Sequence, residues 1–121
     1  MEPAKSFKDL IVRQKAHELV LGIYRLTMKF PKEELYGLIS QMRRASVSIP
    51  ANIVVGFKKR GIKDKVRFLS IAEGSLEELK YYLILTSDLE YASTDQFNQP
   101  VDEIGKLLTS YSKALFKNSI S

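Results

Sequence analysis

Four stretches of the chain repeat apolar residues with the 3.6-residue period of an amphipathic α-helix, and this pattern constrains the fold more than any other feature. No stretch shows the sustained alternation of apolar and polar residues that marks a half-buried strand. The sequence therefore predicts an all-α protein with helices near 10–29, 32–57, 63–90 and 95–117. Because the connections are short, neighbouring helices should run antiparallel, which gives an up-down-up-down four-helix bundle formed by a single domain, residues 1–121.

The second predicted helix carries a proline inside its apolar stripe. The stripe consists of Leu35, Leu38, Met42, Ala45, Ile49, Ile53 and Gly56. Pro50 lacks an N–H and should remove the hydrogen bond to the Ser46 carbonyl, which predicts a kink without an end to the helix. Short polar side chains at Ser46, Ser48 and Asn52 can satisfy the backbone groups that the proline frees. A ligand site built from these polar groups is the less favoured alternative.

Two of the helices have a second apolar stripe on the face opposite the core. A four-helix bundle buries one stripe per helix, so a second stripe would leave an exposed apolar patch on the monomer. Self-association would cover it. The predicted interface places Leu21, Tyr24 and Met28 of one subunit against Ile71, Tyr81 and Leu85 of a neighbour.

Positive charge is concentrated where the second helix meets the third. The whole chain has 19 Lys and Arg against 14 Asp and Glu, a net charge of +5. Six of these cations, with only Asp64 among them, are Lys58, Lys59, Arg60, Lys63, Lys65 and Arg67. As a flexible interhelix loop, this segment could neutralise phosphates of a nucleic acid and release their counterions. The alternative is a solvated loop that only keeps the protein soluble.

Two further arginines, Arg43 and Arg44, point about 100° apart on the second helix. We expect one to pair with an acid on a neighbouring helix or subunit and the other to face solvent, a structural role that is favoured over a phosphate contact.

The composition leaves little room for catalysis. With one histidine and no cysteine, and without a glycine-rich phosphate loop, the chain cannot assemble a catalytic triad or a zinc site. Arg13 and His17 are similar to the Arg–His pair of helical ribonucleases but have one residue too few between them. We therefore expect a protein that is not an enzyme and has no catalytic residues, metal, cofactor or small-molecule substrate.

No segment has the character of a signal peptide or a membrane span. The first ten residues lack an apolar core, and no apolar run approaches the roughly 18 residues needed to cross a bilayer. The expectation is a cytoplasmic protein without a membrane partner.

Several segments together resemble a small bacterial family, the four-helix-bundle proteins also called 23S rRNA intervening-sequence proteins. The likeness covers about residues 7–117 and includes Glu34-Leu35-Tyr36-Gly37-Leu38, Gln41-Met42-Arg43-Arg44-Ala45, Ser48-Ile49-Pro50-Ala51-Asn52-Ile53, Gly56, and Gly74-Ser75 with Glu77-Glu78-Leu79. Where the family usually has an Ala-Glu pair before the glycine, this chain has Val54-Val55, so the family glutamate is replaced by Val55.

The resemblance implies a ring of five subunits. It also implies a gene within 23S rRNA insertions or, for the accessory proteins of diversity-generating retroelements, beside a reverse transcriptase. Our hypothesis is a non-catalytic, homopentameric accessory protein that binds RNA or a ribonucleoprotein partner through the basic loop, with a reverse transcriptase as one candidate partner. The alternative is a structural or protein-interaction module without nucleic-acid binding.

Overall fold

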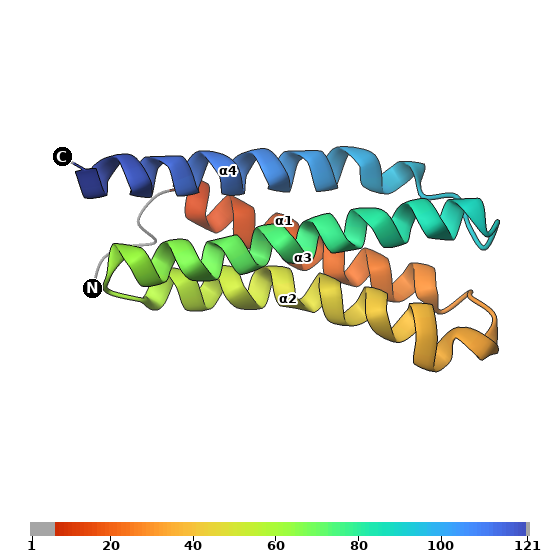
Figure 1. Ribbon diagram of the computed structural model, residues 1–121. Coiled ribbons are helices and arrows are strands. Elements are labelled where there is room, and N and C mark those ends of the chain that lie inside the picture. Colours follow the sequence, from red (N-terminus) through yellow and green to blue (C-terminus); the bar gives the residue numbers. More distant parts are fainter. Residues whose placement is uncertain (1–6, 121) are drawn as a thin grey trace.

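The computed structural model describes the backbone of residues 7–120 and the side chains of Asp9 and residues 11–117. Its elements are α1 (Phe7–Thr27), the 3-10 turn η1 (Lys32–Glu34), the π-helical segment η2 (Leu35–Ile39), α2 (Ser40–Lys58), α3 (Ile62–Asp88), the 3-10 turn η3 (Asp95–Phe97) and α4 (Asn98–Ile120). Consecutive long helices run antiparallel, and residues 7–120 contain no strand (Figure 1). The predicted all-α antiparallel four-helix bundle is confirmed.

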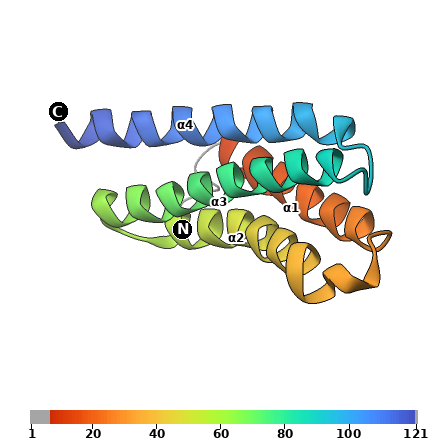
Figure 2. The same cartoon turned by 45° about the vertical axis from the view of Figure 1, so that its right-hand side comes forward.

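The core is formed by one apolar stripe from each helix, as the periodicity predicts. Residues such as Ile23, Ile53, Leu79 and Ile104 are fully buried. Helices α2 and α3 pack against each other (Figure 2), and Gly56 of α2 lies against Phe68 and Leu69 of α3. A side chain at Gly56 would bring a Cβ to 3.3 Å from the Cβ of Phe68, so the glycine permits this contact.

Helix α2 continues through Pro50 to Lys58, as predicted. The polar neighbours of the proline are hydrogen-bonded to one another and to the backbone. The Asn52 amide donates to the Ser48 carbonyl at 2.8 Å and to the Ser48 hydroxyl at 3.0 Å, and the Ser75 hydroxyl of α3 donates to the Ser48 hydroxyl at 2.8 Å. These groups therefore tie α2 to α3, which fits a structural role for Pro50 and Asn52.

The start of the second helical segment differs from the prediction. Instead of one helix from residue 32, a 3-10 turn and a five-residue π segment precede α2, and Gly37 has non-helical dihedral angles (φ −111°, ψ −111°). The kink at Gly37 changes the direction of the side chains before it relative to one continuous α-helix. Leu35, which the period assigned to the core, is therefore 49% exposed, and Ile39 is buried.

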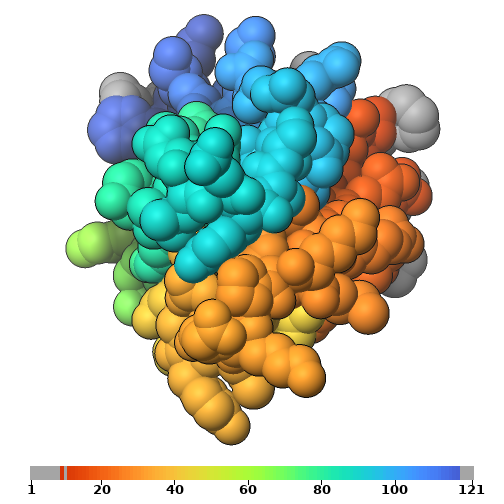
Figure 3. Space-filling view, turned by 90° about the vertical axis from the view of Figure 1, so that its right-hand side faces the viewer, coloured from red at the N-terminus to blue at the C-terminus, as the bar shows by residue number. Residues whose placement is uncertain are grey.

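A carboxylate stabilises this irregular start. Glu34 accepts a hydrogen bond from the Leu38 N–H at 3.2 Å and another from the Tyr91 hydroxyl at 2.7 Å. A Cβ at position 37 would lie 2.8 Å from the same Glu34 carboxylate, so Gly37 leaves room for it. The ring of Tyr91 also packs on Phe30 at 5.4 Å. We call Phe30, Glu34 and Tyr91 the end latch, because they join the α1–α2 and α3–α4 connections at one end of the bundle (Figure 3).

The end latch predicts a specific pH dependence of stability. The hydrogen bonds from Tyr91 and Leu38 hold the pKa of Glu34 below its usual 4.5, so the folded state favours the carboxylate. This contribution is fully present above pH 4.5 and is lost as the pH falls through the lowered pKa. We expect Glu34→Gln to melt at a lower temperature than the unchanged protein near pH 6, with the difference shrinking on acidification below pH 4.5.

The same latch should also weaken in strong base. The bond to Glu34 raises the pKa of Tyr91 above 10, so this contribution is present below pH 10 and is lost as the pH rises through the raised value. Thermal melts monitored by circular dichroism across the pH range measure both the loss of stability in acid and the loss in base. A melting difference between Glu34→Gln and the unchanged protein that stayed constant from pH 6 to pH 3 would contradict the role of the carboxylate.

Candidate functional site

The six predicted nucleic-acid-binding cations lie together at the end of the bundle where α2 meets α3. We call this set the cation cluster: Lys58, Lys59, Arg60, Lys63, Lys65 and Arg67. The loop that connects the two helices is shorter than predicted, because α2 reaches Lys58 and α3 begins at Ile62. Only three residues lie between the helices, and the last three cations belong to the first turns of α3. Most of the cluster is therefore carried by helix ends.

Lys65 supports the connection itself. Its ammonium group donates a hydrogen bond of 3.0 Å to the carbonyl of Phe57, in the last turn of α2. The terminal carbonyls of a helix lack partners within the helix, and a lysine there also complements the negative end of the dipole. Lys65 therefore helps to end α2 and connect it to α3, a role that its place in the basic run did not indicate.

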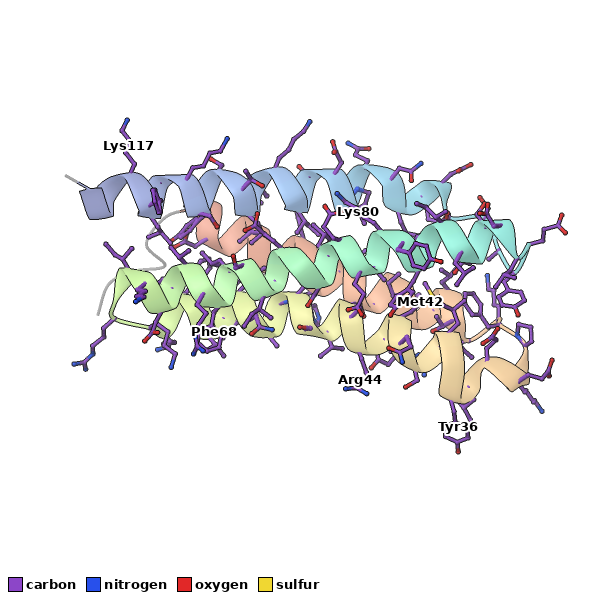
Figure 4. All side chains as sticks on the ribbon, viewed as in Figure 1. Tyr36, Met42, Arg44, Phe68, Lys80 and Lys117 are labelled. Carbon is purple, nitrogen blue, oxygen red and sulfur yellow. The ribbon has the colours of Figure 1, made fainter. Side chains whose placement is uncertain are left out.

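Lys59 and Arg67 both lie against the ring of Phe68. The Lys59 ammonium is 5.2 Å from the ring centroid, and the central guanidinium carbon of Arg67 is 4.8 Å from it. Both distances fall within the range of cation–π attraction. Phe68 is half-buried near the end of the bundle (Figure 4).

The remaining three cations, Lys58, Arg60 and Lys63, are exposed. Three ion pairs between described side chains lie on other surfaces of the bundle: Lys15–Glu103, Lys80–Glu77 and Lys106–Asp102. Lys63 and Arg67 are four residues apart on one helix, a spacing at which like charges repel. An anion bound here would relieve this repulsion, so the cluster is suited to phosphate.

Phe57, which precedes the cation cluster in α2, packs against α4. The centroid of its ring lies 5.1 Å from that of Tyr111. Burial, reinforced by the neighbouring Asp9 carboxylate, raises the pKa of Tyr111 to about 12, and Asp9 is itself only 2% exposed. The neutral phenol thus persists over the physiological range, and this end of the bundle is held by contacts among three helices.

Arg43 has a structural role, but its partner differs from the expected one. Its Nε donates to the Thr27 hydroxyl at 2.9 Å, and an Nη group donates to the Tyr24 carbonyl at 3.4 Å, with the guanidinium 4.5 Å from the Tyr24 ring centroid. Within the described part of the subunit the partner is the last turn of α1 and not an acid, because the carbonyls there already carry the negative end of the helix dipole. Arg44 is exposed and points away from the bundle, as expected for one of the pair (Figure 4).

One exposed apolar surface extends over α1, η2 and α2. It includes the predicted interface residues Leu21, Tyr24 and Met28, the last being 77% exposed. The π segment adds Leu35 and Tyr36, which is 91% exposed, beside an open groove of about 590 Å³ that Ile39, Arg44 and Val47 also line. We call this surface the α1–α2 face. The sequence pattern did not indicate the contribution of η2.

A second apolar surface lies on α3 and follows the prediction in part. Ile71 and Tyr81 are exposed as expected, but Leu85 is partly buried against the core. A helical leucine leans over the preceding turn, which here carries the packed rings of Tyr81 and Tyr82. Ile84, which is 58% exposed, is the more accessible residue. Ile71 lies on a different side of the helix, so we call Tyr81 and Ile84 the α3 face.

Charge is distributed unevenly along the bundle. The end opposite the cation cluster carries five acids against Lys29 and Lys32. The acids are Glu33, Glu34, Asp88, Glu90 and Asp95. They lie in or next to the α1–η1 and α3–η3 connections, which share this end of the molecule (Figure 1).

The residues considered for ribonuclease chemistry lie on α1. His17 is exposed, whereas Arg13 is half-buried with its Nε lacking a hydrogen-bond partner in the described structure.

No group of three or more His, Cys, Asp or Glu side chains suited to a metal ion occurs among the described residues. Within the same part of the chain, no helix combines the length and apolar character needed to cross a membrane.

An all-α antiparallel bundle with a cluster of cations at one end defines a small helical protein with a candidate nucleic-acid interface. Residues 8–111 match the family model described as 23S rRNA-intervening sequence protein. The chain belongs to this family.

A solved structure from the same structural class supports the assignment. The chain is similar to a protein of unknown function from the S23 ribosomal protein family of Bacteroides thetaiotaomicron, with a TM-score of 0.79 and 29% sequence identity. The similarity covers 88% of this chain and 99% of the other. No curated protein matches the chain.

Proposed function

We propose that the protein is a non-catalytic accessory protein that assembles with copies of itself and binds RNA, or a ribonucleoprotein partner such as a reverse transcriptase with its template RNA, through the cation cluster. The observation that carries this proposal is the presence of Lys58, Arg60 and Lys63, all exposed and without an acidic partner among the described residues. Cations that are not neutralised within the protein are free to replace the counterions of a phosphate backbone.

Assembly is supported by the two apolar faces, which carry opposite flanking charge. Arg25, Lys29 and Arg44 accompany the α1–α2 face and outnumber its acids, Glu18 and Glu33. On α3, Glu78 and Asp88 lie one turn from Tyr81 or Ile84, and Glu77 is paired with Lys80. Contact between unlike faces pairs opposite charges, and contact between like faces would bring equal charges together. A repeated contact between unlike faces generates a closed ring when the rotation permits it. The resemblance to the family implies five subunits.

Binding to labelled single-stranded RNA, followed by fluorescence anisotropy, tests the nucleic-acid part of the proposal. We expect binding at about 50 mM salt with little sequence preference, and a log–log salt slope of about −0.7 for each phosphate neutralised. Phosphate contacts from helix ends position a protein on the backbone but do not read bases.

A failure to bind any RNA at about 50 mM salt would favour the second candidate, a protein-interaction module. The exposed apolar side chains of the α1–α2 face, Tyr36 above all, are the observation that supports this second candidate.

A further inference from the structure

We propose that Phe68 is a positioning residue that holds Lys59 and Arg67 as a preformed binding pair for the phosphodiester backbone of RNA. This inference rests on the proposed function and assigns the part of the cation cluster that makes the ordered contact. The other exposed cations, Lys58, Arg60 and Lys63, then contact phosphates through side chains that Phe68 does not hold.

The geometry brings two cations from different segments to one aromatic ring. Lys59 comes from the connection after α2, and Arg67 from the second turn of α3, yet their charged groups lie 5.2 Å and 4.8 Å from the Phe68 centroid. The two charges can therefore be no farther apart than these distances combined. Within about one Debye length at 0.1 M salt, both charges can attract the same anion.

The surrounding contacts hold the ring and the connection in place. The Cβ of Phe68 packs closely over Gly56, where an added Cβ would be 3.3 Å away. Lys65 binds the Phe57 carbonyl at 3.0 Å, and the Phe57 ring packs on Tyr111 at 5.1 Å. Long flexible side chains lose rotamer freedom when they bind a ligand, so cations already held on a ring bind at a lower entropic cost.

The same geometry indicates backbone contact and not base stacking. A base stacks on an aromatic ring whose face is free. Here two cations of the protein lie against the ring of Phe68, so the charged groups and not the ring are presented to the nucleic acid.

Replacing the ring without changing the charge tests the inference. We expect Phe68→Leu to weaken binding of a labelled oligouridylate roughly three- to tenfold at about 50 mM salt, which corresponds to the loss of one or two exposed cation–π contacts. The salt slope should stay unchanged, because the number of neutralised phosphates is the same. Phe68→Tyr keeps a ring and should restore the affinity.

Two comparisons separate this effect from general damage. Tyr91→Leu removes a partly buried ring at the opposite end of the bundle and should leave RNA binding unchanged. If circular dichroism shows Phe68→Leu to be unfolded, Phe68→Met replaces it as the ring-free variant. Equal affinity of the folded ring-free variant and the unchanged protein overturns the role of Phe68 but leaves the proposed function intact. Absence of RNA binding by the unchanged protein overturns both.

Discussion

Changing Lys58, Lys59 and Arg60 to alanine should weaken RNA binding by roughly two to three orders of magnitude at about 50 mM salt. The reason is counterion release, since three lost phosphate contacts on a single strand should also flatten the log–log salt slope by about 2. Lys58 and Arg60 are exposed and Lys59 is partly buried, and none of the three belongs to the core or to either apolar face. Helix content and oligomer size should therefore not change. Anisotropy titrations at several salt concentrations, with circular dichroism and light scattering, measure all three quantities.

The matched control removes the same charge elsewhere. Lys32, Lys106 and Lys113 are exposed and lie outside the cation cluster. Their replacement by alanine should leave the slope nearly unchanged, because they make no phosphate contact in the proposed arrangement. If both triple variants lose affinity equally, binding depends on net charge alone, and the assignment of the site to the cation cluster is wrong.

The double change Met28→Glu with Ile84→Glu should convert the assembly into folded helical monomers. Both side chains are largely exposed in the subunit, so the subunit itself should tolerate the change. Burial of an apolar side chain of this size is worth roughly 1.5 to 3 kcal/mol, and each subunit of a ring would lose it at both of its interfaces. Size-exclusion chromatography with light scattering measures the mass directly. Ile84 is preferred to Leu85 because Leu85 packs against the core.

A control for added negative charge is available on polar surfaces. Gln14 of α1 and Gln99 of α4 are exposed and lie outside the two apolar faces, so Gln14→Glu with Gln99→Glu should preserve the assembly. A monomeric mass for the unchanged protein at micromolar concentration would refute the assembly proposal. The exposed apolar faces would then require a different protein as their partner.

The sequence predicts the bundle because the signal for it is local. Within each helix the buried residues recur with the helical period, so each helix needs only its own residues to define its buried stripe. Ile23, Ile53 and Ile104 each belong to such a stripe on a different helix. The irregular start of α2 could not be predicted in the same way. Its apolar period continues from Leu35, and the carboxylate of Glu34 is bound by Tyr91, 57 residues away in the chain.

The candidate site shows the same limit. The run of cations in the sequence locates the cluster, but it does not distinguish Lys65, which binds the Phe57 carbonyl, from Lys58, which is exposed. Likewise, Arg43 and Arg44 are adjacent and identical in type, yet only Arg43 reaches the last turn of α1. Such roles depend on which backbone groups the fold brings near a side chain.

The uneven charge along the bundle has a consequence for how the protein would approach a polyanion. With cations gathered at the α2–α3 connection and acids at the opposite end, each subunit behaves as an electric dipole. In a cyclic ring the dipole components along the symmetry axis add, whereas the perpendicular components cancel. If the bundles are inclined toward the symmetry axis, the ring keeps a net dipole along that axis. The field of a nucleic acid would then exert a torque on the ring before contact and turn one rim toward the nucleic acid.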